Sequence, residues 1–375
     1  MHSPNEHRVY RKFFLLTHDL AALIQFLTDL REARLPALSF TQAYVLEELG
    51  YAGLYLRDRT VPALRPHEVL VRMRAASLNF RDIKIIRGIY ARRPVLPVVI
   101  LSDGAGDVSA VGPEVQRFSE GDRVIPIYMN GWHHGPLSGR HSGWKGLGGD
   151  VDGTATKFAV FHEDDVVSIP DGLSYEEAAC IPCAGVTAWH ALVSSGQIKT
   201  GDTVLTQGSG GVSIFGLQIA LMSGAQVLAI SSNDKKLDRL RDMGASVTVN
   251  YKTTPDWDQE ILLATGGVGV DHVLEVGGDG TMERSIRATA KGGNIAVVGD
   301  LSGRLSELNS DEHQIRMSAI IVGSRSMMEQ LLRAITLHSR TPVIDRIFPF
   351  AKLREALAYL EQGFGHFGKV VIKYV

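Results

Sequence analysis

A glycine-rich turn follows a short apolar run and precedes a helical apolar pattern; it comprises Gly208, Ser209, Gly210, Gly211 and Val212. Glycines let a backbone approach a diphosphate closely, and the next helix directs free N–H groups and the positive end of its dipole at that anion. Although Ser213 stands where a third glycine is usual, the order strand, turn, helix is typical of a dinucleotide-binding βαβ unit. We therefore predict a dinucleotide site at this turn.

The end of the second apolar run, Val227 to Ile230, indicates which dinucleotide is bound. An NAD site usually places Asp or Glu there, about 20 residues past the first glycine, to bind the ribose 2′-hydroxyl. This chain has Ser231 and Ser232, followed by Lys236. Hydroxyls and a cation suit a 2′-phosphate, so the sequence predicts NADP(H) over NAD(H). The alternative for the lysine is a solvated first turn of helix.

Two cysteines, Cys180 and Cys183, are present, three apart in an apolar stretch. Their scarcity argues against a disulfide framework and for a reducing compartment, so we expect a cytoplasmic protein. The spacing matches a redox C-x-x-C motif, but the neighbouring residues lack the electropositive setting that such a motif needs.

The chain has 375 residues, of which 45% are hydrophobic, and a net charge of −2, which allows two domains and gives no reason to expect nucleic-acid binding. Phe13 to Leu30 has helical apolar spacing, but Asp19 and Asp29 interrupt it, so we expect no membrane span. No cleavage site marks a signal peptide. We favour a surface amphipathic helix, or a translation start placed too early, over an organelle-targeting segment.

The remaining elements fall into two groups. Short β-rich runs with frequent glycine and proline, from residue 42 to about 170, predict a compact antiparallel barrel-like domain with a long loop at 130–154. After the glycine turn, further parallel strands are expected at Val270–Gly278 and Gly293–Gly299, with a last strand at Ala319–Gly323. The tail, Lys369–Val375, reads as a strand that returns to the first domain.

Several ordered motifs resemble the medium-chain dehydrogenase/reductase superfamily, and especially its zinc-independent quinone oxidoreductase and alcohol-dehydrogenase-like branch. They are Ser77-Leu78-Asn79-Phe80-Arg81-Asp82, Glu120–Val124, Cys183–Trp189, the Gly208 turn, Asn250-Tyr251 and His366–Val371. The resemblance implies an α/β fold in which a Rossmann doubly wound parallel sheet is joined to a GroES-like, mostly antiparallel β domain. The implied boundaries are an extension at 1–40, a GroES-like domain at 41–170 completed by 341–375, and a Rossmann domain at 171–340.

The resemblance also assigns roles to residues. It implies that Asn79 and Asp82 line the substrate side, although a turn and helix cap would explain them equally well. It places Thr187 beside the nicotinamide and Gly299 and Asp300 in a loop over the nicotinamide ribose. With the glycine-turn residues and the two serines, the implied cofactor site is completed by Lys236, Tyr251, Gly277, Phe367 and Lys369.

No metal ion is expected. Zinc-containing members of the superfamily place Cys where Asn79 stands and a Gly-His-Glu set where Ser102-Asp103-Gly104 stands, so that Cys183 alone matches a catalytic ligand. A zinc site needs at least three protein ligands of thiolate, imidazole or carboxylate type. Asp103, His133, His134 and His141 have suitable side chains but no recognisable ligand spacing.

The function implied by the resemblance is NADPH-dependent hydride transfer, without metal, to a small electrophile such as a quinone, an enone or a related carbonyl. Phe80 stands where close relatives often have Tyr, so a proton would have to come from water or Asp82, or the substrate would be an electron sink such as a quinone. The alternatives are a zinc-type alcohol dehydrogenase and a non-catalytic NADPH-binding protein. The resemblance further implies a homodimer formed by edge pairing of the last Rossmann strand.

Overall fold

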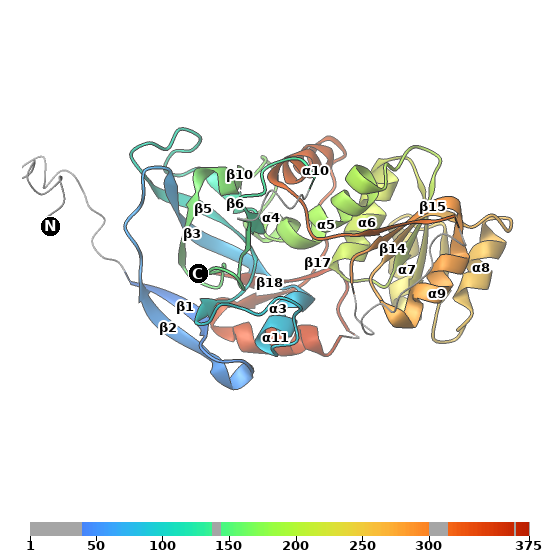
Figure 1. Cartoon of the computed structure of the whole chain (residues 1–375), viewed down its shortest axis with the longest axis horizontal. Helices are drawn as coiled ribbons and strands as arrows, with labels where there is room; N and C mark the ends of the chain where they lie inside the picture. The colour runs from blue at the N-terminus through green and yellow to red at the C-terminus, as the bar shows by residue number, and fades with distance from the viewer. Residues whose placement is uncertain (1–39, 137–143, 300–313, 364, 375) are drawn as a thin grey trace, which may run out of the picture. The chain divides into compact units, whose positions relative to one another are not determined.

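The structure is a computed structural model that describes residues 40–136, 144–299, 314–363 and 365–374 (Figure 1). Our predictions for residues 1–39, for His141 and for Asp300 lie outside these ranges. Contacts group Thr41–Arg59 with the described residues from Leu64 onward in one compact unit. In the parts of the chain just given, no helix has the length and apolar character needed to cross a bilayer.

Six parallel strands form the nucleotide-binding sheet, in the order β13-β12-β11-β14-β15-β16. This is the doubly wound order of a Rossmann sheet, with the topological switch point between β11 and β14. The strands are β11 Thr203–Gln207, β12 Gln226–Ser231, β13 Val247–Asn250, β14 Val270–Glu275, β15 Thr289–Val297 and β16 Arg316–Ala319. The helices after them are α6 Gly211–Met222, α7 Asp234–Asp242, α8 Trp257–Ala264, α9 Asp279–Ala288 and α10 Arg325–Leu337.

The last strand of this sheet is Arg316–Ala319, so our prediction of Ala319–Gly323 was wrong. Its pairing with β15 ends at Ala319 opposite Val297, and the N–H of Ile320 makes the final bond to the Val297 carbonyl at 2.8 Å. Gly323 then packs so closely on Val186 that a Cβ there would lie 2.7 Å from a Val186 methyl carbon. The chain therefore leaves the sheet edge and turns into α10.

The second part is mostly antiparallel β structure, which confirms the predicted fold class. Three strands pair in the order β2-β1-β4: β1 Phe40–Leu46, β2 Leu54–Thr60 and β4 Val98–Val99. A seven-stranded sheet contains β3 Glu68–Ser77, β5 Asp103–Val111, β6 Arg123–Pro126, β9 Phe158–His162, β10 Val166–Ser168, β17 Ile344–Pro349 and β18 Lys369–Lys373. Within the long loop, β7 Met129–Asn130 pairs with β8 Lys145–Gly146. The helices of this part are α3 Phe80–Ile86, α4 Tyr175–Ala178 and α11 Leu353–Glu361. Helix α5 Val186–Trp189 packs on α6 and α10 and lies between π-helical turns at Ile181–Gly185 and His190–Ser195.

Strand β18 joins the two parts, as predicted for the tail. It pairs antiparallel with β3, with Val371 opposite Ser77. Just before it, the N–H of Gly368 donates to the carbonyl of Ser209 at 2.9 Å, and Gly368 bridges to Gly210. The same segment therefore lies against both the glycine turn and the strand that leads to Asn79.

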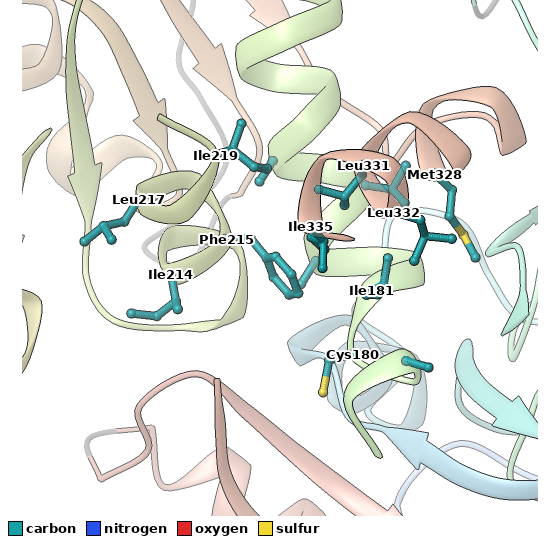
Figure 2. Close-up of a cluster of buried hydrophobic side chains, with 14 of the residues drawn as sticks. Cys180, Ile181, Ile214, Phe215, Leu217, Ile219, Met328, Leu331, Leu332 and Ile335 are labelled. Carbon is teal, nitrogen blue, oxygen red and sulfur yellow. The ribbon is translucent and has the colours of Figure 1, made fainter. Parts of the chain in front are cut away.

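A buried apolar cluster supports the helical wall between the two parts (Figure 2). Phe215 of α6 and Leu331 of α10 pack on the segment that contains Ile181 and Gly185. A Cβ on Gly185 would lie 3.0 Å from Cδ2 of Leu331 and 3.2 Å from Cε1 of Phe215, so this position is sterically restricted. Burying such side chains stabilises the fold by about 1.5–3 kcal/mol each, and it fixes the wall that carries Cys183 and Thr187.

Candidate dinucleotide and substrate site

The glycine turn has the geometry of an anion site. Gly208 has a φ of +76°, which favours glycine, and its N–H donates to the Ile230 carbonyl at 2.6 Å. Helix α6 begins at Gly211, and its first-turn N–H groups are available to an anion. The Oγ of buried Ser213 donates to the Gln207 carbonyl at 2.6 Å. Ser213 thus ties α6 to β11, which explains a serine at the third motif position.

The residues predicted for the adenosine side meet at the carboxyl edge of β12 and β13. Ser231 is paired with Asn250, and the N–H of Tyr251 donates to the Ser231 carbonyl at 3.1 Å. Lys236 lies in the first turn of α7, where its N–H donates to Oδ1 of the N-cap residue Asn233. The structure thus brings Ser231, Ser232, Lys236 and Tyr251 to one edge, although Ser231 itself is buried.

Glu275, at the end of β14, holds the loop that contains Gly277, and sequence reasoning missed it. Its Oε1 accepts hydrogen bonds from the N–H groups of Gly277 at 2.7 Å and Gly278 at 3.1 Å, and from the Thr281 hydroxyl at 2.6 Å. Its Oε2 accepts from the Gln207 amide at 2.7 Å. The sequence signal that could have identified Glu275 is an acidic residue at the end of a buried strand with two glycines shortly after it.

Gly277 and Gly299 lie on neighbouring strand ends. A Cβ on Gly299 would lie 2.5 Å from the Val276 carbonyl oxygen, so the two loops touch through the backbone. Thr187 is buried on α5, four residues after Cys183. The structure therefore places Gly277 just after β14 at the switch point, Gly299 just after the neighbouring strand β15, and Thr187 on α5, which packs against α6, whereas Asp300 lies beyond the described residues.

On the substrate side, a buried ammonium group holds Asn79. Nζ of Lys369 donates to Oδ1 of Asn79 at 2.5 Å and to the Leu78 carbonyl at 2.8 Å, and lies 3.5 Å from Oδ2 of Asp103. Lys369 is 3% exposed and Asp103 is fully buried. The Asp103 carboxylate also accepts from the Ser102 hydroxyl at 3.0 Å and the Ser77 hydroxyl at 3.2 Å. Every acceptor around the ammonium is therefore an oxygen, as a buried cation requires.

This arrangement fixes the orientation of the Asn79 amide. An ammonium can only donate, so the atom that faces it must be the amide oxygen. The amide nitrogen then faces Oγ of Ser102 at 3.5 Å, the limit of a hydrogen bond, and remains able to donate elsewhere. We had predicted Lys369 as a cofactor-binding residue. Its stem does pass the glycine turn, because a Cβ on Gly211 would lie 2.6 Å from its Cδ, but its charge is directed at Asn79.

Asp82 forms a capping box with Asn79 at the start of α3. Its Oδ2 accepts from the N–H of Asn79 at 2.8 Å, and its Oδ1 lies 3.3 Å from Nη1 of Arg81. Burial raises the pKa of this carboxyl to about 6, against the opposing effect of Arg81. The turn-and-cap interpretation therefore describes its contacts, and its catalytic role stays a prediction.

Arg81 is a further buried cation that sequence reasoning missed. Its side chain is 10% exposed, and the guanidinium lies 4.7 Å from the ring centroid of Tyr128 and 5.3 Å from that of Tyr90. Its Nη1 donates to the Leu147 carbonyl at 3.1 Å. The two tyrosine hydroxyls are 3.5 Å apart. Phe80, by contrast, is 40% exposed and has no polar atom to offer on its ring.

The donor set does not fit a catalytic zinc ion. The amide oxygen of Asn79 is already bound by an ammonium, and a carboxamide is not among the thiolate, imidazole and carboxylate ligands that zinc sites use. His133 bonds instead to Asp165 at 3.0 Å. Among the residues that the structure describes, no three His, Cys, Asp or Glu side chains gather as a metal site would require.

A separate hollow of about 540 Å³ lies between β10 and α10. It is lined by Arg117, Val167, Ser168, Pro170, Glu329, Leu332, Arg333, Thr336 and Leu337. None of these residues belongs to the sets described above, so the hollow is distinct from the dinucleotide and substrate residues.

Comparison with known proteins finds two family models along the chain. A model described as alcohol dehydrogenase GroES-like domain matches residues 65–171, and one described as zinc-binding dehydrogenase matches residues 211–336. A zinc-type alcohol dehydrogenase-like protein of Schizosaccharomyces pombe is 42% identical over 336 residues, which cover 86% of this chain and 96% of the relative. Human quinone oxidoreductase is 27% identical over 339 residues, 88% of this chain and 96% of that protein.

A solved structure confirms the likeness in three dimensions. The crystal structure of an NAD-dependent alcohol dehydrogenase matches with a TM-score of 0.81 and 34% identity, and the match covers 88% of this chain and 99% of that one. The match spans nearly the whole of the other chain, so both parts of the fold are shared and not the nucleotide-binding sheet alone.

Proposed function

The chain belongs to the medium-chain dehydrogenase/reductase superfamily of NAD(P)-dependent oxidoreductases, and on this premise we propose that it transfers a hydride from NADPH to a quinone, an enone or a related carbonyl without a metal ion. The superfamily contains both alcohol dehydrogenases and quinone oxidoreductases among the relatives of this chain. The choice between them depends on the residues beside the nicotinamide.

The observation that carries the proposal is the 2.5 Å contact between the Lys369 ammonium and the Asn79 amide oxygen. In zinc-containing members of the superfamily a cysteine ligand stands at the position of Asn79. Here a cation of the chain itself already binds the side chain at that position. Because the position offers an amide N–H rather than a metal ligand, it suits a substrate oxygen that accepts a hydrogen bond.

The dinucleotide would supply the hydride, and the chain would bind and orient both reactants. The first-turn N–H groups of α6 would hold the diphosphate, and Glu275 would hold the Gly277 loop against the nicotinamide half. Asn79 would donate its amide N–H to the substrate oxygen as negative charge develops on it. Thr187 would lie beside the nicotinamide, on the wall that the Phe215 cluster supports.

The contacts of Asp82 bear on the class of substrate. Both of its oxygens are engaged, one by the Asn79 N–H and one beside Arg81, so a proton from Asp82 would break the capping box. Phe80 has no proton to give. A quinone or an enone, whose reduced anion can take a proton from water, therefore suits the site better than a simple ketone.

The preference for NADP(H) is supported by the side chains at the end of β12. Ser232 directly follows β12 and Lys236 lies in the first turn of α7, while Asp234, the first acid after β12 in the chain, accepts a hydrogen bond from the Asn250 amide at 2.6 Å. NAD(H), the coenzyme named for the solved alcohol dehydrogenase, is the alternative. The contrast between NADPH and NADH for a Lys236 variant, given in the Discussion, decides between them.

The proposal is tested on the full chain by metal analysis and turnover. After dialysis against a chelator, we expect substoichiometric zinc and undiminished NADPH-dependent reduction of quinones and enones. Stoichiometric zinc, with activity lost on chelation and restored by zinc, would establish the zinc-type alcohol dehydrogenase instead. NADPH binding with no turnover on any electrophile would favour a non-catalytic binding protein.

We also propose a homodimer, because β16 is an edge strand that pairs with β15 on one side only within the described sheet. Unpaired N–H and C=O groups on such an edge can pair with a second copy. Sedimentation should give a dimer, and Ala319→Pro should weaken it, because this substitution removes a backbone donor that faces away from β15. A monomeric parent chain at micromolar concentration would exclude this assembly.

A further inference from the structure

His366 lies beside the glycine turn and plays no part in the roles assigned so far. The imidazole Nε2 is the side-chain atom nearest to Gly210, because a Cβ built on that glycine would lie 4.0 Å from it. Two residues later, the backbone of Gly368 is hydrogen-bonded to Ser209 at 2.9 Å and bridges to Gly210. The position of the imidazole relative to the turn is therefore fixed by the backbone.

The imidazole carries an unsatisfied polar atom. Nδ1 of His366 is buried and has no hydrogen-bond partner among the residues that the structure describes. The nitrogen nearest to the turn is the other one, Nε2, and it is the ring atom that could donate a hydrogen bond to a ligand there. A phosphate oxygen is an acceptor of the kind that a protonated imidazole can bind.

The charged groups around this imidazole are mostly cations. Lys236 and Arg239 approach from α7 and Lys369 from β18, while Asp345 approaches from β17. The Arg239 guanidinium lies 3.7 Å from the ring centroid of Phe367, the residue after His366. Asp345 is already engaged, because it accepts from the Phe367 N–H at 3.1 Å and the Tyr359 hydroxyl at 2.6 Å.

These surroundings disfavour a second proton on His366 in the free chain. Burial lowers its pKa, Lys236 and Lys369 lower it further, and Asp345 opposes them. Burial likewise lowers the pKa of Lys236, with a contribution from Arg239. An anion placed among these cations would reverse the effect, because a nearby negative charge favours the protonated form of each.

We propose that His366 binds the diphosphate of the dinucleotide at the Gly208–Gly211 turn and takes up one proton from solvent when it does so. The inference rests on the proposed dinucleotide function. It adds that coenzyme binding depends on the protonation state of His366. Coenzyme affinity should then fall as the pH rises above neutrality, because the proton becomes harder to acquire. NADPH and NADH should show the same uptake, since both contain the diphosphate.

Calorimetry tests the proposal on the full chain. NADPH is titrated at about pH 7, above the ordinary pKa of histidine, in HEPES and in Tris, whose ionisation enthalpies differ. We expect the measured enthalpy to depend on the buffer in the sense of proton uptake. His366→Gln should abolish that dependence and weaken binding about tenfold to a hundredfold, the value of a charge-assisted hydrogen bond. His338→Gln, at the exposed residue that caps the C-terminus of α10, is the matched control and should change neither quantity.

The outcomes separate the inference from the function on which it rests. Tight NADPH binding without proton uptake, or with uptake that persists in His366→Gln, overturns the inference and leaves the reductase proposal intact. Uptake with NADPH but not with NADH would place His366 at the 2′-phosphate and overturn the assignment to the diphosphate. Absence of any binding of NADPH or NADH overturns both proposals together.

Discussion

The ammonium nitrogen of Lys369 lies 2.5 Å from the amide oxygen of Asn79, although 290 residues separate them in the chain. The contact orients the amide so that its nitrogen faces Ser102 and the substrate side. It also connects two sites, because the stem of the same lysine passes the glycine turn at Gly211. The position of Asn79 therefore depends on a strand that is itself bridged to the coenzyme turn.

Asn79→Asp tests the amide as a hydrogen-bond donor. The carboxylate keeps an oxygen for Lys369 but has no N–H for a substrate oxygen. Removal of one such donor typically lowers kcat about 10²–10³-fold, so we expect a loss of this size with NADPH affinity unchanged. Steady-state kinetics with a quinone and a separate NADPH titration give the two quantities. Wild-type turnover in this variant would rule out the donor role.

Lys369→Met should destabilise the fold, because it leaves the fully buried Asp103 carboxylate without its cation. Breaking a buried ion pair in this way typically costs about 3–5 kcal/mol. Urea unfolding gives the change in free energy. The double variant Lys369→Met with Asp103→Asn removes the uncompensated charge and should recover part of the loss. Equal losses in the single and double variants would mean that the pair is not coupled.

Lys236→Ala should weaken NADPH much more than NADH, because only NADPH presents a phosphate at the end of β12. A charge-assisted hydrogen bond is worth about 1.5–3 kcal/mol, or about tenfold to a hundredfold in Kd. Fluorescence titration with both coenzymes measures the contrast. Lys235→Ala changes an exposed lysine on the same helical turn and serves as the control. Equal losses for NADPH and NADH would count against the NADP(H) assignment.

Cys183→Ser should leave coenzyme binding intact and activity largely retained, because the thiol has no metal to bind. Its pKa of about 12 keeps it protonated, so alkylation by iodoacetamide should be slow at about pH 8, where an ordinary thiol reacts readily. Mass spectrometry of the modified chain measures the rate. Rapid alkylation of Cys183 in the native chain, or loss of a bound metal in the serine variant, would contradict this account.

Asp82 predicts a pH dependence of stability. Its pKa rises from the ordinary 3.8 to about 6 in the fold, so the folded chain holds the proton more tightly than the unfolded chain. The contribution of the protonated Asp82 carboxyl to stability is fully present below pH 3.8 and is lost as the pH rises through 6. Between about pH 5 and about pH 7.5 this loss is roughly 1–1.5 kcal/mol. Relative to Asp82→Asn, the parent chain should therefore lose stability over this interval in urea unfolding. Parallel pH profiles would show that the carboxyl does not titrate there.

Local patterns predicted the local elements well. The apolar run at Val227–Ile230 and the helix from about Lys235 correspond to β12, Gln226–Ser231, and α7, Asp234–Asp242. The apolar periodicity of these two elements and the polar turn between them depend only on neighbouring residues. The sequence of the segment alone is therefore enough to predict them. Helix α3 begins at Phe80, directly after the Asn79–Asp82 capping box that the residue types suggested.

Features set by distant partners could not be predicted. The last strand ends at Ala319 because its hydrogen bonds to β15 end there, and nothing in the apolar run that follows marks that point. The direction of the Lys369 ammonium depends on Asn79 and Asp103, which lie far away in the chain. In the sequence, Glu275 looks like an ordinary residue at the end of a strand. In the structure its carboxylate accepts hydrogen bonds from three separate segments of the chain.

The bridge between Gly210 and Gly368 has a consequence for making chimeric enzymes. A recombinant that takes its nucleotide-binding half from this chain, residues 171–340, would leave behind the strand that fastens the phosphate loop and the imidazole next to it. The other parent enzyme would supply the corresponding strand, which has not been matched to this glycine turn. Grafts of coenzyme preference between such proteins should therefore carry residues 366–373 along with the donor half.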